Sequence, residues 1–129
     1  MLSHVHIGVT DFQRAFAFYS LVMDALGYPL KFSVPEKSSA AWMPAGAERP
    51  LLLVGHPFNG KPATPGNGQM VALLAPSRSA VDKCFDVAIA NGARSEGAPG
   101  LRPQYHPSYY GAYFCDPDGN KLCVCCHHP

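Results

Sequence analysis

The chain has 129 residues and a formal net charge of +1, which allows one domain with a buried core. Its lysines and arginines are scattered, so no basic stripe predicts nucleic-acid binding, and no apolar run approaches the roughly eighteen residues that span a membrane. Four of the five cysteines lie within the last fifteen residues, a pattern that favours reduced thiols in the cytoplasm over a secreted disulfide framework.

Residues 2–9 are predicted to form a strand because their side chains alternate in character. Val5 and Ile7 fall on one face, and His4 and His6 fall on the other. The helix that follows is expected to cover the apolar face, which leaves both histidines on the opposite, concave side. A histidine there can act as a general base or a metal ligand. The alternative is a hydrogen-bonded histidine without a chemical role.

Residues 11–26 are predicted to form the first helix. Asp11 is a favourable N-cap residue, and Gly27 suits the left-handed conformation that often ends a helix. Between them, apolar residues recur at three- and four-residue spacing, which marks one buried face. The residues of this face are Phe12, Ala15, Phe16, Tyr19, Val22, Met23 and Leu26.

Three strands and a linker are expected to complete the first half. Residues 29–34, 40–43 and 51–54 are largely apolar and are separated by turn-forming residues. Trp42 on the middle strand is a candidate ligand contact, although core packing is the more frequent position of such residues. Residues 55–68 contain four glycines and three prolines, which is typical of a linker.

The second half repeats this order. A strand is predicted at 69–75, a helix at 77–90, a long loop at 96–108, and two strands at 109–115 and 121–126. The last two strands are joined by Asp116-Pro-Asp-Gly-Asn120, where proline is preset for a turn and glycine permits a positive φ. The repeated order predicts two modules, at about 1–56 and 69–129, that share one cleft across a pseudo-twofold axis.

The two ends of the chain carry a family resemblance. The opening His4-Val-His-Ile-Gly-Val-Thr-Asp11 with Phe18-Tyr19, and the closing Phe114-Cys-Asp-Pro-Asp-Gly-Asn120, resemble the vicinal oxygen chelate superfamily of glyoxalase I, bleomycin resistance proteins and extradiol dioxygenases. The resemblance covers essentially the whole chain. It implies an α+β fold in which paired βαβββ modules form a curved mixed sheet around a cleft, with the helices outside. It also implies a homodimer, but it does not specify the function, because this fold carries many activities.

The resemblance further implies four positions for metal ligands, early in the first strand and on the last strand of each module. His4 matches the first position, and Cys123 stands where a glutamate is usual. The remaining two fall on apolar residues, at Met70 or Ala72 and at Leu52 or Leu53. A catalytic zinc ion normally has three protein ligands. A divalent metal is therefore not expected in the usual site, and the cofactor stays unassigned.

The densest group of polar and aromatic residues lies between residues 102 and 110. Tyrosine and histidine combine apolar faces with hydrogen-bonding tips, which suits the wall of a small-molecule site. His106 is a candidate acid or base, with Tyr109 or Tyr110 as hydrogen-bond donor. Arg102 and Tyr105 are candidate ligand contacts. The alternative is a proline-braced loop whose tyrosines only close the core.

Cys123, Cys125 and Cys126 precede His127 and look like a soft-metal cluster. Successive strand residues point to opposite faces, however, so Cys125 and Cys126 cannot easily hold one ion. Small buried hydrophobic residues are the favoured interpretation of these cysteines. Cys123 alone is expected on the cleft side, where it joins His6, Trp42 and Met70 as a candidate ligand contact.

Two functions remain open from the sequence. The first is a glyoxalase-like enzyme of the lyase, isomerase or dioxygenase type, which would abstract a proton beside a carbonyl with His4 or His106 as base. The second is a metal-free protein that sequesters a ligand in an aromatic cleft. The missing metal-ligand positions favour the second, whereas His4 and the polar loop keep the first open. In both cases the expected partner is a small molecule, with no nucleic acid and no membrane.

Overall fold

A computed structural model describes all 129 residues and contains two four-stranded sheets and two long helices. The elements are β1 (His4–Gly8), α1 (Phe12–Leu26), β2 (Leu30–Val34), a short 3-10 helix η1 (Pro35–Lys37), β3 (Ser39–Trp42), β4 (Leu51–Gly55), β5 (Val71–Leu74), α2 (Arg78–Ala90), β6 (Arg94–Leu101), β7 (Tyr110–Cys115) and β8 (Lys121–Cys126). The strand orders are β1-β4-β3-β2 and β5-β8-β7-β6. The same order in both halves confirms the predicted α+β fold of paired βαβββ modules.

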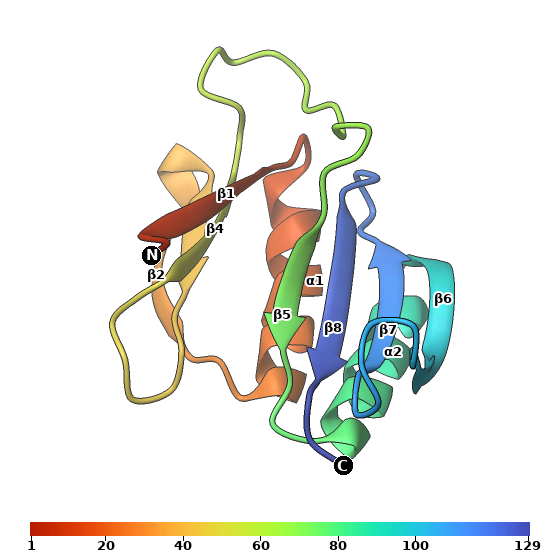
Figure 1. Ribbon diagram of the computed structural model, residues 1–129. Helices are drawn as coiled ribbons and strands as arrows, with labels where there is room; N and C mark the ends of the chain where they lie inside the picture. The colour runs from red at the N-terminus through yellow and green to blue at the C-terminus, as the bar shows by residue number, and fades with distance from the viewer.

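Each sheet is mixed and open. The first strand of each module pairs in parallel with the last, as β1 with β4 and β5 with β8, and the other pairs are antiparallel. No hydrogen-bonded strand pair joins the two sheets, which lie side by side (Figure 1). Helix α1 lies behind the gap between them and packs against α2. The linker after β4 crosses above this gap to reach β5 (Figure 1).

Helix α1 begins and ends where the sequence predicts. The Asp11 side chain accepts a hydrogen bond from the backbone N–H of Arg14, and Gly27 has a φ of 79°. The predicted apolar face is largely buried, but Phe18, which lies outside it, is only 2% exposed. Its ring lies 6.3 Å from that of Phe114 in the second module. The helix therefore buries a wider stripe than one sheet requires, because it contacts both modules.

Helix α2 also follows the prediction. The Ser77 side chain caps it by accepting a hydrogen bond from the N–H of Ala80. Val81, Cys84 and Ala88 are fully buried against the second sheet and α1. This packing places both helices on the same side of the sheets, and it leaves the opposite, concave faces free for a site.

The predicted loop at 96–108 is wrong in its first half. Residues 94–101 form β6, which pairs with β7 alone and is therefore an edge strand. Pro99 is tolerated there because an edge strand needs hydrogen bonds on only one side. The register with β7 is irregular around Gly97 and Gly100, so the strand bends where the sequence suggested that no strand exists.

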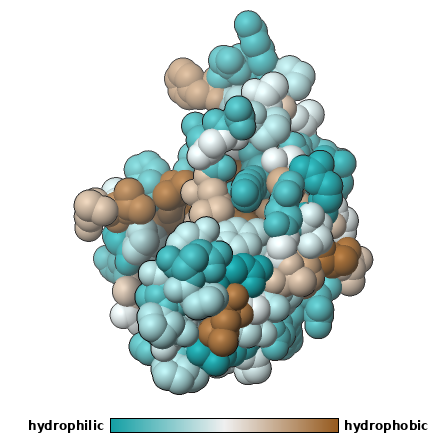
Figure 2. Space-filling model, turned by 45° about the vertical axis from the view of Figure 1, so that its right-hand side comes forward, coloured by the Kyte–Doolittle hydropathy of each residue, from teal (hydrophilic) through white to brown (hydrophobic).

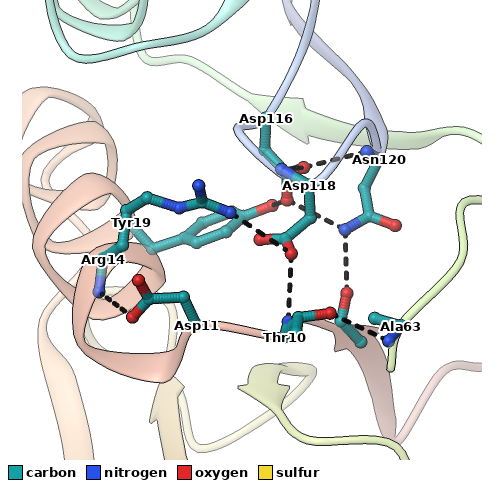
Figure 3. A network of polar contacts seen from close by, with 9 residues as sticks. Thr10, Asp11, Arg14, Tyr19, Ala63, Asp116, Asp118 and Asn120 are labelled. Carbon is teal, nitrogen blue, oxygen red and sulfur yellow. Dashed lines mark hydrogen bonds and ion pairs between the residues drawn. The ribbon is translucent and has the colours of Figure 1, made fainter. Parts of the chain in front are cut away.

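The closing turn connects the two modules (Figure 3). Asp116 Oδ1 accepts hydrogen bonds from the backbone N–H of Asp118 and of Asn120, at 2.9 and 2.8 Å. Asn120 Nδ2 donates to the carbonyl oxygen of Gly8 in β1 at 2.9 Å. Gly119 has a φ of 92°, as the predicted turn requires. The turn thus holds the start of β8 close to the end of β1.

The surface is mostly hydrophilic on the face seen in Figure 2, and its hydrophobic residues form small, separate groups. Some large apolar side chains are nevertheless exposed beside the gap between the sheets, including Leu2, Met70 and Leu74. Neither helix is long and apolar enough to cross a membrane.

Candidate functional site

A cavity of about 510 Å³ lies at the gap between the two sheets. Thirteen of its fifteen lining residues are hydrophobic. Val5 and Trp42 line it from the first sheet, Met23 lines it from α1, and residues 70–74 line it from β5 and the residue before it. The cavity exists because β1 and β5 are both edge strands that do not pair with each other. Trp42 and Met70, two predicted ligand contacts, thus lie in its wall.

A smaller pocket of about 130 Å³ adjoins this cavity and is polar in character. The two share Met70 and Val71 in their walls, so they meet at the start of β5. His6, Gln69 and Lys121 belong to the smaller pocket only. The apolar cavity and the polar pocket therefore lie side by side.

The two histidines of β1 lie on the concave face, as their alternation predicts, and both are exposed. His4 Nδ1 lies 2.9 Å from Ser3 Oγ, and His4 lines neither pocket. The pKa of His6 is lowered, first by partial burial and then by the nearby His4. His6 lines the polar pocket, and its ring makes no hydrogen bond within the protein.

Cys123 lies beneath two tyrosines on the concave face of the second sheet. The Tyr109 hydroxyl lies 3.4 Å from Cys123 Sγ, and the Tyr113 hydroxyl donates to the Tyr109 oxygen at 3.2 Å. Gly111 makes room for the ring of Tyr109, because a Cβ there would lie 2.8 Å from a ring carbon. We call Tyr109, Tyr113, Cys123 and Cys125 the thiol–tyrosine cluster.

Hydrogen bonding shifts the pKa values of the two thiols in this cluster in opposite directions. The pKa of Cys123 is lowered to about 7, first by its contact with Cys125 and then by the two tyrosine hydroxyls, although burial opposes the change. The contact with Cys123 and burial raise the pKa of Cys125. Burial also raises the pKa of Tyr109, so its hydroxyl keeps its proton and donates toward Cys123. All five cysteines are free thiols.

His106 is fully engaged by its neighbours. Its Nδ1 accepts a hydrogen bond from the backbone N–H of Ser108 at 3.2 Å, and its Nε2 lies 2.8 Å from Nδ1 of His127. In that arrangement the proton of His106 is on Nε2 and is donated to His127. His127 Nε2 in turn lies 3.7 Å from Cys125 Sγ. A base needs a free lone pair, so this geometry does not favour His106 as the proton acceptor.

Tyr110 lies on the helix side of its strand, opposite to Tyr109. Its hydroxyl donates to Asp82 Oδ1 on α2 at 2.6 Å, and the guanidinium of Arg78 lies 5.5 Å from the centre of its ring. Neighbouring residues of a strand point to opposite faces, so Tyr109 and Tyr110 cannot share one site. Tyr110 joins strand to helix rather than lining the concave face.

Arg102 and Tyr105 lie at the outer rim of the thiol–tyrosine cluster. Arg102 Nη2 donates to the carbonyl oxygen of Ala98 at 2.7 Å, and its guanidinium lies 5.6 Å from the ring centre of Tyr113. Tyr105 is 63% exposed and packs its ring 5.0 Å from that of Tyr109. These residues cover the cluster from solvent but do not reach the cavity between the sheets.

The residues at the four implied metal positions do not fit a divalent ion. On the parallel partner strands, His4 pairs in register with Leu51 and Cys123 pairs with Ala72, so these strands add no metal-binding side chain. No three His, Cys, Asp or Glu side chains come together anywhere in the chain in a way that could hold an ion. Because a catalytic divalent metal needs about three such ligands, the donor set is incomplete.

Several residues of these sites were not identified from the sequence. Tyr113 lies four residues after Tyr109. Because side chains alternate along a strand, this even spacing predicts that both tyrosines lie on the same face of the sheet. Lys121 and Thr64 line the polar pocket, and their positions depend on the course of the linker and on the docking of the modules. No local sequence signal reports that docking.

Residues 1–124 match the model of the Glyoxalase/Bleomycin resistance protein/Dioxygenase superfamily. Among curated protein sequences, none is detectably similar to this chain. A crystal structure of a glyoxalase/bleomycin resistance protein from Albidiferax ferrireducens T118 is similar with a TM-score of 0.86 and 34% identity, covering 98% of both chains.

More distant structures share the fold alone. A glyoxalase/bleomycin resistance protein/dioxygenase family enzyme from Burkholderia phytofirmans PsJN is similar with a TM-score of 0.70 and 21% identity, covering 97% of both chains. A glyoxalase-related enzyme from Fulvimarina pelagi has a TM-score of 0.71 and 19% identity, covering 98% of this chain and 87% of its own. At these identities the similarity carries no conclusion about ligands.

Proposed function

Because this chain belongs to the Glyoxalase/Bleomycin resistance protein/Dioxygenase superfamily, we propose that it binds a small organic molecule in the cavity between its two sheets, without a divalent ion at the position usual for metal-using members. The observation that carries this proposal is the cavity itself. Its volume of about 510 Å³ lies within the range of small-molecule sites, about 300–1,000 Å³, and its lining is almost wholly apolar.

The geometry supports binding more than the proton-abstraction chemistry considered from the sequence. Both ring nitrogens of His106 are engaged, and Tyr110 lies on the helix side. His4 is exposed and lies outside both pockets. A general base must lie within hydrogen-bond reach of the proton that it removes, and none of these groups is placed beside the cavity. A role in sequestering a ligand therefore agrees better with the side chains present.

Trp42 provides a direct test, because it is the only tryptophan and it lines the cavity. We expect uncharged phenylalkyl amides of increasing chain length to change its fluorescence in a saturable way. The affinity should be unaffected by a metal chelator. A chain that shows no saturable change with any member of this series, up to millimolar concentration, would contradict the proposal.

A pair of variants distinguishes the cavity from non-specific binding. Ala72 is exposed at the cavity wall, so Ala72→Phe is expected to fill part of the space without disturbing the core. Ala98 is similarly exposed, but on edge strand β6 at the far side of the second sheet. We expect Ala72→Phe to weaken binding of the amides and Ala98→Phe to leave it unchanged. Equal loss in both variants would place the bound probe elsewhere.

A further inference from the structure

The polar pocket beside the cavity gathers hydrogen-bonding groups that the protein itself does not use. His6 of β1, Gln69 before β5 and Lys121 of β8 line this pocket. None of these side chains makes a hydrogen bond or an ion pair within the protein. They come from three separate segments, so their convergence follows from the docking of the two modules.

The chemistry of this pocket favours a negatively charged group. Its lining includes Lys121, His6 and the side-chain amides of Gln69 and Asn120, but no aspartate or glutamate. The Lys121 ammonium has no carboxylate within 4.0 Å, and it lies 5.9 Å from the ring centre of Tyr113. A lysine that forms no ion pair, placed beside uncharged hydrogen-bonding groups, attracts an anion and can form a charge-assisted hydrogen bond with it.

The walls of the pocket are held in place by hydrogen bonds among its lining residues and their neighbours. Asn120 Nδ2 donates to the carbonyl oxygen of Gly8 and to Asp116 Oδ2, at 2.9 and 3.0 Å. The linker is fixed by the N–H of Ala63, which donates to Thr10 Oγ1 at 2.9 Å. These bonds hold the end of β1, the linker and the start of β8 around one small space, as the close-up in Figure 3 shows for Asn120, Thr10 and Ala63.

We propose that the ligand class of this protein is a small amphipathic anion, whose apolar body occupies the cavity between the sheets and whose carboxylate or other anionic group occupies the polar pocket against Lys121, His6 and Gln69. This inference rests on the proposed function, because it assigns a ligand class to the same cavity. The two spaces share Met70 and Val71 in their walls, so one ligand that crosses this boundary reaches both.

The test compares three probes that each carry a phenyl ring on a short alkyl chain and end in an anionic, an uncharged or a cationic head. These are phenylbutyrate, the uncharged phenylbutyramide and the cationic phenylbutylamine, each titrated at neutral pH while Trp42 fluorescence is measured. A partly exposed ion pair contributes up to about a fivefold gain in affinity. We therefore expect phenylbutyrate to bind about two- to fivefold more tightly than the amide, and the amine to bind more weakly than the amide.

Lys121→Gln should remove the advantage of phenylbutyrate while leaving the affinity for phenylbutyramide unchanged, which also shows that the variant cavity is intact. Lys83→Gln is the matched control, because Lys83 is exposed on α2 and lines neither pocket. Equal affinities for the acid and the amide, or an advantage that persists in Lys121→Gln, would overturn this inference but leave the cavity proposal intact. Failure of all three probes to change Trp42 fluorescence would overturn both.

Discussion

The hydroxyl of Tyr19 donates a hydrogen bond of 2.5 Å to Oδ2 of Asp116, which joins helix α1 of the first module to the closing turn of the second (Figure 3). Both residues are buried, and they lie 97 positions apart in the chain. Burial first, and then the charge of Asp116, raises the pKa of Tyr19 well above its ordinary value. The donor therefore keeps its proton, and the buried carboxylate is compensated across the boundary between the modules.

We expect Tyr19→Phe to lower the free energy of unfolding by about 1.5–3 kcal/mol, the usual cost of losing a hydrogen bond to a charged group. Chemical denaturation followed by circular dichroism measures this loss. Tyr105→Phe is the control, since the Tyr105 side chain is largely exposed, and it should change stability by less than about 0.5 kcal/mol. Equal effects of the two substitutions would show that the buried bond adds nothing to the docking of the modules.

Tyr110→Phe tests whether this residue supports structure or ligand binding. Its hydroxyl donates to Asp82 on α2, and this pair is only partly buried. We therefore expect a smaller loss of stability than for Tyr19→Phe, about 1 kcal/mol, with unchanged binding of the phenylalkyl amides at Trp42. Asp82→Asn retains an acceptor oxygen and should cost less. A variant that keeps full stability but loses ligand affinity would restore Tyr110 to the site predicted for it from the sequence.

The sequence predicts the fold well because the fold depends on local periodicity. The alternation in β1 and the helical spacing of α1 and α2 each report one buried face, and the turn at 116–120 carries its own geometry. Prediction from the sequence fails for β6, because Pro99 and two glycines are unusual in a strand. They are tolerated here because β6 is an edge strand. The prediction also fails for Phe18, whose burial needs the second module.

The site is harder to predict, because its residues meet through register and docking. Tyr113 faces Cys123 only because the β7–β8 register pairs them. Lys121 and His6 line one pocket only because the two modules lie side by side. The alternation of side chains along a strand does predict that Tyr109 and Tyr110 face opposite sides of the sheet. Applied along β7, the same rule assigns Tyr109 and Tyr113 to the concave face and Tyr110 to the helix side.

Cys123 is expected to titrate near neutral pH. Its contacts with Cys125, Tyr109 and Tyr113 lower its pKa to about 7, whereas burial raises the pKa of Cys84 to about 12. Thiolate absorbance in the ultraviolet should therefore rise with a midpoint near pH 7 in the folded protein. Cys123→Ser should abolish this step, and Cys84→Ser should retain it. A step that survives in Cys123→Ser would assign it to another thiol.

The same shift predicts the pH dependence of stability. The folded pKa of Cys123, about 7, lies below its ordinary value of 9.0, so the unfolded chain binds the proton more tightly. The stabilisation from this thiolate is present above pH 9.0 and is lost as the pH falls through about 7. The free energy of unfolding of the wild type, relative to that of Cys123→Ser, should thus increase as the pH rises from about 7 to 9.0. A constant difference would show that the thiol keeps its proton in the folded protein.

Metal content tests the expectation that no divalent ion binds tightly in the usual site. His4 and Cys123 are the only potential ligands at the four implied positions, and one is exposed whereas the other is covered by Tyr109 and Tyr113. Two donors of different softness bind weakly, and a catalytic zinc ion normally has three protein ligands. We therefore expect protein purified without a polyhistidine tag to contain far less than one equivalent of zinc, nickel or manganese by elemental analysis.

The variant His128→Ala controls for metal that is held by the exposed histidine near the C-terminus. Stoichiometric metal that is lost in His4→Ala but retained in His128→Ala would contradict the expectation, because it would require His4 to recruit partners that the present register keeps apart.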